Sequence, residues 1–221
     1  MAEPEPRRIP EATVVRLPLY YRILVELAEE GTPTVASERL AQRAGVNAAK
    51  VRKDLSYLGS FGTRGVGYDV DYLLFEMSGQ LGLTEDRPVV IVGAGNLGQA
   101  LSKYGGFGAR GFPVAALVDT DPAKIGRIVN GLEVRPPSEL SRLCSDLDVA
   151  IGIVATPAGA AQRVVDALCE AGVCSILNFA PAIVTAPDGV TLRKVDLAVE
   201  LQILSFYQQR QDPDPALETS G

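Results

Sequence analysis

The 221-residue sequence contains no histidine. Histidine is the side chain most often used as a general base near neutral pH, and it is the commonest metal ligand. Its absence excludes Ser-His-Asp and Cys-His catalytic sites and every zinc site built on imidazole ligands. The sequence also lacks a Tyr-x-x-x-Lys pair, which could have supplied the proton donor of a hydride-transfer enzyme.

Long hydrophobic runs and cysteines are scarce as well. No apolar run approaches the roughly 18 residues of a membrane-spanning helix, and no charged-then-apolar leader opens the chain. We therefore expect a cytoplasmic protein without a membrane partner. The three cysteines, Cys144, Cys169 and Cys174, are an odd number in a chain too large to need disulfides. We expect buried core thiols, with a redox-active pair of Cys169 and Cys174 as the alternative.

The net charge of −6 is unevenly distributed along the chain. Residues 37–68 carry six basic and two acidic side chains, a local charge of +4, whereas residues 81–221 carry a local charge of −5. Such asymmetry indicates a basic binding patch on an acidic body. The basic residues of the patch are Arg39, Arg43, Lys50, Arg52, Lys53 and Arg64.

Three short helices are predicted in the N-terminal region. The first covers residues 18–30, where four apolar residues fall at positions i, i+3, i+4 and i+7. The second follows Ser37 as N-cap and ends near Gly45, and the third follows Asn47 as N-cap and runs to about Leu58. The apolar stripe of the first helix consists of Tyr20, Ile23, Leu24 and Leu27.

The third helix has an apolar face and a basic, hydrogen-bonding face. Its apolar face is formed by Ala48, Val51, Leu55 and Leu58, and its outer face by Ala49, Lys53, Ser56 and Tyr57 with Lys50 and Arg52 beside them. A helix that enters the major groove of DNA needs such an outer face. An ordinary solvated surface is the alternative interpretation.

The stretch "FGTRGVGYDV", residues 61–70, predicts a β-hairpin with Arg64 at its tip. A cation between glycines is suited to a narrow minor groove. Helix, short helix, helix and hairpin is the order of a winged helix-turn-helix, which predicts binding to double-stranded DNA. The residues expected at the DNA are Ser37, Arg43, Asn47, Ala49, Lys50, Arg52, Lys53, Ser56, Tyr57, Arg64 and Gly65.

The stretch "VVIVGAGNLG" carries a glycine fingerprint between a predicted strand, Val89–Val92, and a predicted helix. Gly93 permits a tight turn, Gly95 lets backbone amides approach a pyrophosphate, and Gly98 lets the helix pack closely on the strand. The helix N-terminus then faces the anion. This pattern predicts a dinucleotide site.

The next predicted strand, "FPVAALVD", ends in Asp119. A carboxylate at this place can accept both ribose hydroxyls and repels a 2′-phosphate, which favours NAD(H) over NADP(H). The alternative is that Asp119 only caps a helix over "DPAKIG".

Further alternation of strands and helices predicts an α/β fold with a parallel sheet. Residues 148–156 and 173–181 are expected as strands, with a helix over residues 158–172 between them. Asp71 is expected to cap a helix over residues 71–83 that links the two regions. The terminal stretch "DLAVELQILSFYQQR" is apolar almost all round, which predicts a helix buried in a partner subunit.

Taken together, the sequence resembles the Rex family of redox-sensing bacterial repressors. The resemblance rests on "RLPLYYRIL", "AAKVRKDLSYLGSFGTRGVGY", "VGAGNLGQAL", "GFGARGF", "VDTDPAKIG", "ILNFAP" and "VDLAVELQILS", in family order over about residues 9–207. It implies a homodimer with an N-terminal winged helix, a Rossmann core and a C-terminal helix exchanged between subunits. It also implies an inverted-repeat operator that is released when NADH binds, with NAD+ competing for the same site.

The resemblance suggests a division of the chain and a set of ligand contacts. We expect a DNA-binding domain at 1–80, a Rossmann domain at 84–195, a dimerisation helix at 196–210 and a disordered tail at 211–221. A switch between Tyr104 and Asp196, with Arg16 as partner in the DNA-bound state, is expected to report the redox state. Expected cofactor contacts are Gly93, Ala94, Gly95, Asn96, Leu97, Gly98, Tyr104, Asp119, Thr120, Lys124, Thr156, Pro157, Phe179 and Ala180.

Two other functions remain open from the residues alone. A dehydrogenase would need a substrate pocket and a proton donor, yet residues 84–195 are taken up by the nucleotide fold itself. A winged-helix regulator that senses another nucleotide, such as coenzyme A, is the closer alternative. No metal is expected at either site.

Overall fold

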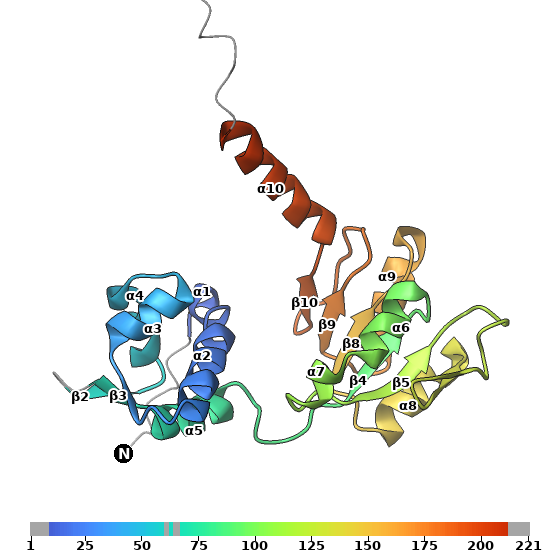
Figure 1. Cartoon of the computed structure of the whole chain (residues 1–221). Coiled ribbons are helices and arrows are strands. Elements are labelled where there is room, and N and C mark those ends of the chain that lie inside the picture. The colour runs from blue at the N-terminus through green and yellow to red at the C-terminus, as the bar shows by residue number, and fades with distance from the viewer. Residues whose placement is uncertain (1–8, 60–61, 64–66, 212–221) are drawn as a thin grey trace, which may run out of the picture. The chain divides into compact units, whose positions relative to one another are not determined.

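A computed structural model of the chain describes residues 9–59, 62–63 and 67–211 (Figure 1). The chain divides after Glu85 into two compact units, and each is treated below by itself. The predicted disordered tail, apart from Gln211, falls within residues 212–221, and Arg64 and Gly65 belong to the segment 64–66. All of these lie outside the described residues.

The N-terminal unit contains five helices and three short strands among its described residues. The antiparallel sheet has the order β1-β3-β2, with Gly62 of β2 opposite Tyr68 of β3. The elements are α1 (Glu11–Val14), α2 (Leu17–Glu29), β1 (Thr34–Val35), α3 (Ser37–Ala44), α4 (Ala48–Ser56), β2 (Gly62–Thr63), β3 (Gly67–Asp69) and α5 (Val70–Gln80).

A single apolar core holds these helices together. All four residues of the predicted stripe on α2 are buried, and so are Val51 and Leu55 from the predicted inner face of α4. Leu73 and Met77 bring α5 to the same core. Periodicity therefore identified the inner faces correctly, and the three helices with an antiparallel strand pair form a winged-helix arrangement.

Two predicted helix starts are wrong and one is confirmed. Asn47 caps α4, because its side chain accepts a hydrogen bond of 2.8 Å from the backbone N–H of Lys50. Ser37 is instead the first helical residue of α3, after Ala36. Asp69 caps α5 in place of Asp71, because strand β3 ends there and the chain turns directly into the helix. Helix α4 also ends at Ser56, two residues earlier than predicted.

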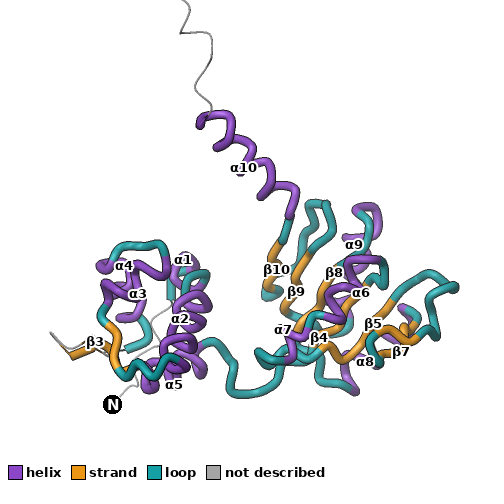
Figure 2. Tube along the Cα trace, viewed as in Figure 1, coloured by secondary structure: helices purple, strands orange, loops and turns teal. Residues whose placement is uncertain are grey.

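The second unit is built on a seven-stranded sheet of order β10-β9-β8-β4-β5-β7-β6 (Figure 2). Six strands are parallel, and only β6 at the edge is antiparallel. The strands are β4 (Val89–Val92), β5 (Val114–Val118), β6 (Ile128–Val129), β7 (Leu132–Arg135), β8 (Ile151–Val154), β9 (Ser175–Asn178) and β10 (Thr191–Lys194). Strand β4 has the predicted bounds.

Helices cover both faces of this sheet. One face packs against α8 (Leu140–Asp146) and α9 (Ala158–Glu170) and the other against α6 (Asn96–Lys103) and α7 (Gly105–Gly108). A 3-10 turn, η1 (Pro137–Glu139), leads into α8. When the six parallel strands are numbered by their order in the chain, their order across the sheet is 3-2-1-4-5-6. This is the doubly wound nucleotide-binding topology. The predicted α/β fold with a parallel sheet is confirmed.

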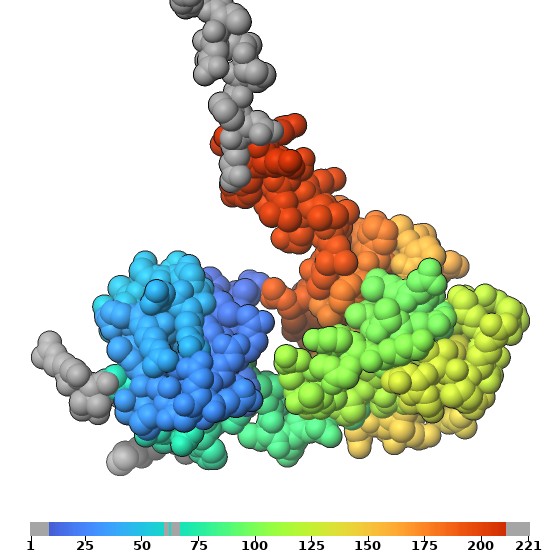
Figure 3. All heavy atoms as spheres, viewed as in Figure 1, coloured from blue at the N-terminus to red at the C-terminus, as the bar shows by residue number. Residues whose placement is uncertain are grey.

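The terminal helix α10 (Leu197–Gln211), orange-red in Figure 3, has exposed apolar side chains. Large apolar side chains are more often buried than left in water. The expected apolar helix is therefore present. The described part of its own chain does not bury its apolar side chains. The exposed residues are Leu197, Val199, Leu201, Ile203, Leu204, Phe206 and Tyr207.

The cysteine prediction holds only in part. Cys144 of α8 is buried in the core, where burial raises the pKa of its thiol. Cys169 is half-buried, and Cys174 is exposed because it lies in the turn between α9 and β9. Only Cys144 is thus the buried core thiol expected of all three.

Candidate functional site

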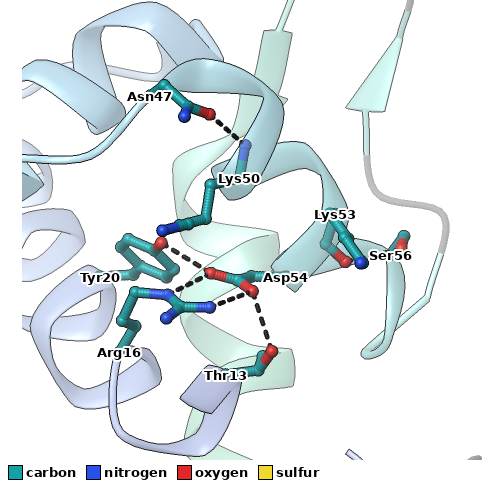
Figure 4. Close-up of polar contacts among 8 residues, drawn as sticks. All are labelled: Thr13, Arg16, Tyr20, Asn47, Lys50, Lys53, Asp54 and Ser56. Carbon is teal, nitrogen blue, oxygen red and sulfur yellow. Dashed lines mark hydrogen bonds and ion pairs between the residues drawn. The ribbon is translucent and has the colours of Figure 1, made fainter. Parts of the chain in front are cut away.

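The outer face of α4 presents small and basic side chains to solvent. Ala49, Lys50, Lys53 and Ser56 are exposed, and Tyr57 is half-buried just beyond the helix end. Figure 4 shows Lys53 and Ser56 on the side of α4 that faces away from the buried Asp54. Within the described part of the chain neither lysine forms an ion pair, so both charges are available to a ligand.

Two arginines of the predicted DNA-binding set are held by carboxylates. Arg43 Nη2 lies 2.8 Å from Glu30 Oε1. Arg52 Nη1 lies 3.0 Å from Glu38 Oε1 and donates to the Ser37 hydroxyl at 2.8 Å. Ser37 itself is buried, which explains why its hydroxyl holds Arg52 in place. These arginines would have to exchange carboxylate for phosphate on binding DNA.

A buried carboxylate ties α4 to the first two described helices of the chain, α1 and α2. Asp54 accepts 2.7 and 2.8 Å hydrogen bonds from Arg16 Nε and Nη2, 2.9 Å from Thr13 and 2.8 Å from Tyr20 (Figure 4). Its side chain is only 2% exposed. One residue of α4 is thereby fixed to α1, to α2 and to the turn between them.

The ionisation of this cluster follows from its contacts. Burial alone would raise the pKa of Asp54, but hydrogen bonds from Arg16, Tyr20 and Thr13 hold that pKa below its usual value. Burial, followed by the hydrogen bond to Asp54, raises the pKa of Tyr20 to about 12. In the sequence, Asp54 is only one of the two acidic residues within residues 37–68, and no local pattern indicates that it is buried.

This cluster also bears on the expected switch role of Arg16. Both its Nε and its Nη2 already bind Asp54 in a bidentate pair. Removing one partner of a buried ion pair typically costs about 3–5 kcal/mol. The pair with Asp54 therefore gives Arg16 a structural role in the DNA-binding unit, and its expected contact with Tyr104 or Asp196 stays a prediction.

In the second unit, four predicted cofactor residues and the predicted switch residue Asp196 lie at the carboxyl edge of the sheet. Gly93, Asp119, Thr156, Phe179 and Asp196 each lie one or two residues beyond the end of a parallel strand, in the order β4, β5, β8, β9 and β10. Consecutive connections leave β4 in one direction and β8 in the other, which opens a crevice between them. Ligands of doubly wound folds bind at this reversal point.

The glycine fingerprint lies at this crevice, directly after the end of β4, as expected. Gly93 has φ +111°, and a Cβ there would strike the Ala155 carbonyl. A Cβ on Gly98 would overlap the Gly93 carbonyl, so α6 can approach β4 only with glycine at this place. A Cβ on Gly95 would meet open space. Gly95 therefore borders open space through which a phosphate could approach the backbone amides of the loop.

Asp119 is buried beside the loop, with 8% of its surface exposed. It accepts hydrogen bonds from the N–H groups of Ala94 (2.7 Å) and Asp121 (2.8 Å), and its Oδ2 lies 3.1 Å from Lys124 Nζ. Burial would raise its pKa, but these donors lower it, so it is ionised at neutral pH. Three of about four acceptor positions are occupied, which leaves room for about one ribose hydroxyl bond.

The alternative role of Asp119 as a helix cap is not supported. Residues 122–126 form turns and no helix. The carboxylate instead connects the glycine loop to the turn that follows β5, because its Oδ2 binds Ala94 and its Oδ1 binds Asp121. It thus supports the loop in addition to facing the crevice.

Thr156 supplies a second sign that a ligand belongs in the crevice. Its Oγ1 is buried, and no described residue forms a hydrogen bond with it. Its methyl group lies beside Gly93. A buried hydroxyl without a partner is unfavourable by about 1–3 kcal/mol, so a ligand that binds it would remove this cost.

The remaining predicted residues divide between two ends of the unit. Asn96, Leu97, Thr120, Pro157, Phe179 and Ala180 lie at the carboxyl edge. Tyr104 lies beyond the other end of α6, about 12 Å along the helix axis from Asn96, and it lines a small pocket of about 170 Å³ with Lys103 and Asn130. Asp196 pairs with Lys194 at 3.0 Å. Within one chain, Tyr104 is therefore not brought to the glycine loop.

The described residues contain no cluster of three or more potential metal-ligating side chains. No helix in the described part of the chain is long and apolar enough to cross a membrane. A winged-helix unit with a basic outer helix is joined to a dinucleotide-type fold with a glycine cradle and an orphaned hydroxyl. Together these features define a ligand-responsive DNA-binding regulator.

Comparison with known proteins identifies the group of regulators. Residues 8–56 match a family model described as "Putative DNA-binding protein N-terminus", and residues 84–182 match one described as "CoA binding domain". The chain is 61% identical to the redox-sensing transcriptional repressor Rex of Streptomyces coelicolor over 95% of this chain and 81% of the relative. The Rex of Streptomyces avermitilis is 62% identical over 95% and 83%.

The chain belongs to the Rex family of redox-sensing transcriptional repressors. The family consists of repressors and not of enzymes, although it has a dehydrogenase-like fold. A solved structure described as "RSP in complex with beta-NAD+ and operator DNA" aligns with a TM-score of 0.87 at 33% identity, covering 92% of this chain and 94% of that one. RSP in complex with beta-NADH aligns at 0.82 and 32%, covering 92% and 95%.

The Asp54 cluster predicts a large loss of stability in Asp54→Asn. Arg16 would lose its buried carboxylate partner, so we expect the free energy of unfolding at pH 7 to fall by about 3–5 kcal/mol. Urea unfolding of the full chain, followed by circular dichroism, measures this. Asp71→Asn makes the same change at an exposed carboxylate of α5 and should alter stability by less than about 0.5 kcal/mol. Equal stability of the two variants would contradict the role given to Asp54.

The same cluster fixes the direction of the pH dependence. The pKa of Asp54 is lowered on folding, so its contribution is present above about pH 3.9 and is lost as the pH falls through the folded value. The pKa of Tyr20 is raised to about 12, so stability should also be lost between about pH 10 and that value. Unfolding curves at both extremes measure these losses, and the acid loss should shrink in Asp54→Asn.

The glycine fingerprint predicts opposite results for two similar substitutions. In Gly98→Ala the new methyl group overlaps the Gly93 carbonyl, so α6 must move away from β4. We expect a loss of about 1–3 kcal/mol or more, as for other overpacked sites. Gly95→Ala adds its methyl group in open space and should be stable. Thermal unfolding of both variants measures the difference, and equal midpoints would contradict this packing.

Proposed function

We propose that this protein is a homodimeric repressor that binds an inverted-repeat operator and releases it when NADH binds. The observation that carries the proposal is the pairing, in one chain, of a basic winged helix with a glycine cradle beside an orphaned hydroxyl. A protein of this kind acts on the chromosome, so we also place it in the cytoplasm. Membership of the Rex family supports both statements.

The DNA contacts are proposed for the outer face of α4 and its surroundings. Ala49, Lys53 and Ser56 would face the base edges in the major groove, and Tyr57 would lie at the helix end. Lys50, Arg43 and Arg52 would bind phosphates, with Ser37 positioning Arg52 and Asn47 fixing the helix start. Arg64 and Gly65 are proposed for the minor groove from their place in the sequence alone.

The nucleotide contacts are proposed for the carboxyl edge of the sheet. The N–H groups from Gly93 to Gly98 would bind the diphosphate, and Asp119 would accept a ribose hydroxyl. Thr156 would use its unpaired hydroxyl, flanked by Pro157, Phe179 and Ala180. Thr120 and Lys124 would border the adenosine end. The open side of Gly95 and the buried Thr156 Oγ1 both fit NAD(H), which supplies a ring whose charge differs between the two redox states.

The switch is proposed to lie between subunits. The uncovered apolar side chains of α10 need a partner surface, and a second copy of the chain can supply one. Asp196 immediately precedes α10, and Tyr104 lies about 12 Å along α6 from the glycine loop. The two would meet across the dimer. Arg16 is proposed as their partner in the DNA-bound state, through the Nη1 group that does not bind Asp54.

Coenzyme A is the second candidate ligand, since residues 84–182 match a family model for its binding. Coenzyme A carries a 3′-phosphate on its ribose, close to where Asp119 would stand. The carboxylate of Asp119 disfavours a phosphate there. A titration with NADH, NADPH and coenzyme A separates these candidates, and we expect tight binding of NADH only.

The proposed function predicts reciprocal coupling between NADH and operator DNA. NADH should weaken operator binding by about 5–150-fold, and operator DNA should weaken NADH binding by the same factor. NAD+ should bind with a much smaller effect on the operator. Mobility shifts and NADH fluorescence titrations measure the two arms. Equal NADH affinity with and without operator would rule out a redox-responsive repressor.

The DNA arm has its own control in Lys53→Ala. This exposed lysine makes no ion pair within the described residues, so its loss should leave the fold and NADH affinity unchanged. Operator binding should weaken by about 1–3 kcal/mol if Lys53 contacts a base. A phosphate contact would instead weaken all sequences alike and lower the salt slope by about one. Unchanged operator affinity would remove Lys53 from the interface.

Thr156→Val tests the nucleotide crevice. Valine has the shape of threonine without its unpaired hydroxyl, so the free energy of unfolding should stay equal or rise by up to about 3 kcal/mol. NADH affinity should fall roughly three- to tenfold through loss of one hydrogen bond. Thr185→Val, at an exposed position, is the matched control. Wild-type NADH affinity in Thr156→Val would show that the hydroxyl faces no ligand.

A further inference from the structure

The adenosine end of the crevice carries two opposed signals for cofactor choice. A carboxylate at the end of the second parallel strand favours a ribose with free hydroxyls, whereas a nearby arginine accommodates a 2′-phosphate. Asp119 provides the first signal. Arg135 provides the second, because it ends β7, the strand next to β5, and its carbonyl accepts a 3.1 Å hydrogen bond from the N–H of Asp119.

The ion pairs around Arg135 decide between these signals. Its Nε and Nη2 bind Glu139 Oε2 at 2.9 and 2.6 Å, and its Nη1 binds Glu133 Oε2 at 2.8 Å. The hydrogen bonds that Arg135 donates to Glu139, and then to Glu133, raise the pKa of Arg135. Both sides of its planar fork are therefore occupied by carboxylates, in the geometry that a phosphate would otherwise take.

The other cation at this edge is engaged in the same way. Lys124 Nζ lies 3.1 Å from Asp119 Oδ2 and 3.7 Å from Asp121 Oδ2. Neither Lys124 nor Arg135 is thus available as a free positive charge. A 2′-phosphate would bring about two negative charges to a place where each cation already has a carboxylate partner.

We propose that Glu133 and Glu139 determine the preference for NADH over NADPH by withholding Arg135 from the ribose. They are positioning residues, since they act through the arginine and need not touch the nucleotide. The inference rests on the proposed function, because it assigns the specificity of the same nucleotide site. It differs from the role of Asp119, which acts by its own charge.

The test is a titration of Glu133→Gln/Glu139→Gln with NADH and with NADPH. Glutamine keeps the size of each side chain and removes the charge that holds Arg135. We expect NADPH affinity to rise at least tenfold while NADH affinity changes less than twofold. Unchanged NADPH affinity in a variant that still binds NADH would overturn the proposal. NADH binding by the variant also reports that its fold is intact.

Two controls separate this effect from a general change in charge. The double variant Glu170→Gln/Asp188→Asn also removes two negative charges, at exposed positions away from Arg135. It should leave the ratio of NADPH affinity to NADH affinity unchanged. Arg135→Met in the double-glutamine background should abolish the gain. If the gain persists without Arg135, or appears in the charge control, the proposal is wrong.

Two further outcomes are also decisive. If the double variant loses NADH binding, the single Glu133→Gln variant, which keeps the Glu139 pair, must show an intermediate gain for NADPH, and its absence would overturn the proposal. If the wild-type protein binds neither dinucleotide, the proposed function itself fails. A wild type that binds NADH with an unchanged ratio in the variants refutes only the role of the two glutamates.

Discussion

The buried carboxylate of Asp54 is the interaction on which the DNA-binding unit depends. The adjacent Lys53 faces solvent, while Asp54 binds Thr13, Arg16 and Tyr20 beneath the helix. An ion pair of this burial adds little net stability over apolar packing, but it is strongly unfavourable when broken. It therefore fixes the orientation of α4 more than it strengthens the fold. That orientation decides which side chains of α4 can reach DNA.

The nucleotide unit depends on a comparable constraint, which is steric. Gly93 and Gly98 allow β4 and α6 to approach so closely that no Cβ fits between them. This approach directs the helix N-terminus at the crevice, while Thr156 and Asp119 reach the same place from neighbouring strands. A rigid cradle of this kind can bind the parts that NADH and NAD+ share. Discrimination between the two redox forms must then come from elsewhere in the dimer.

Carboxylates hold arginines in place in both units of the chain. Arg43 is bound by Glu30 in the DNA-binding unit, and Arg135 by Glu139 beside the nucleotide crevice. Both pairs are partly exposed and contribute little to stability. These pairs instead determine whether each arginine is available to bind a phosphate, because the carboxylate must first be displaced.

The sequence by itself determined the features that depend on local chemistry: the apolar stripe of α2, the cap at Asn47, strand Val89–Val92 and the glycine fingerprint. Hydrophobic periodicity and backbone sterics depend on residues a few positions apart, so these features can be predicted from the sequence alone. Only the tertiary structure decided that Asp54 is buried against Arg16 and that Asp119 supports the loop. These depend on contacts between residues 25 to 38 positions apart, and no local pattern encodes which distant partner a charge will meet.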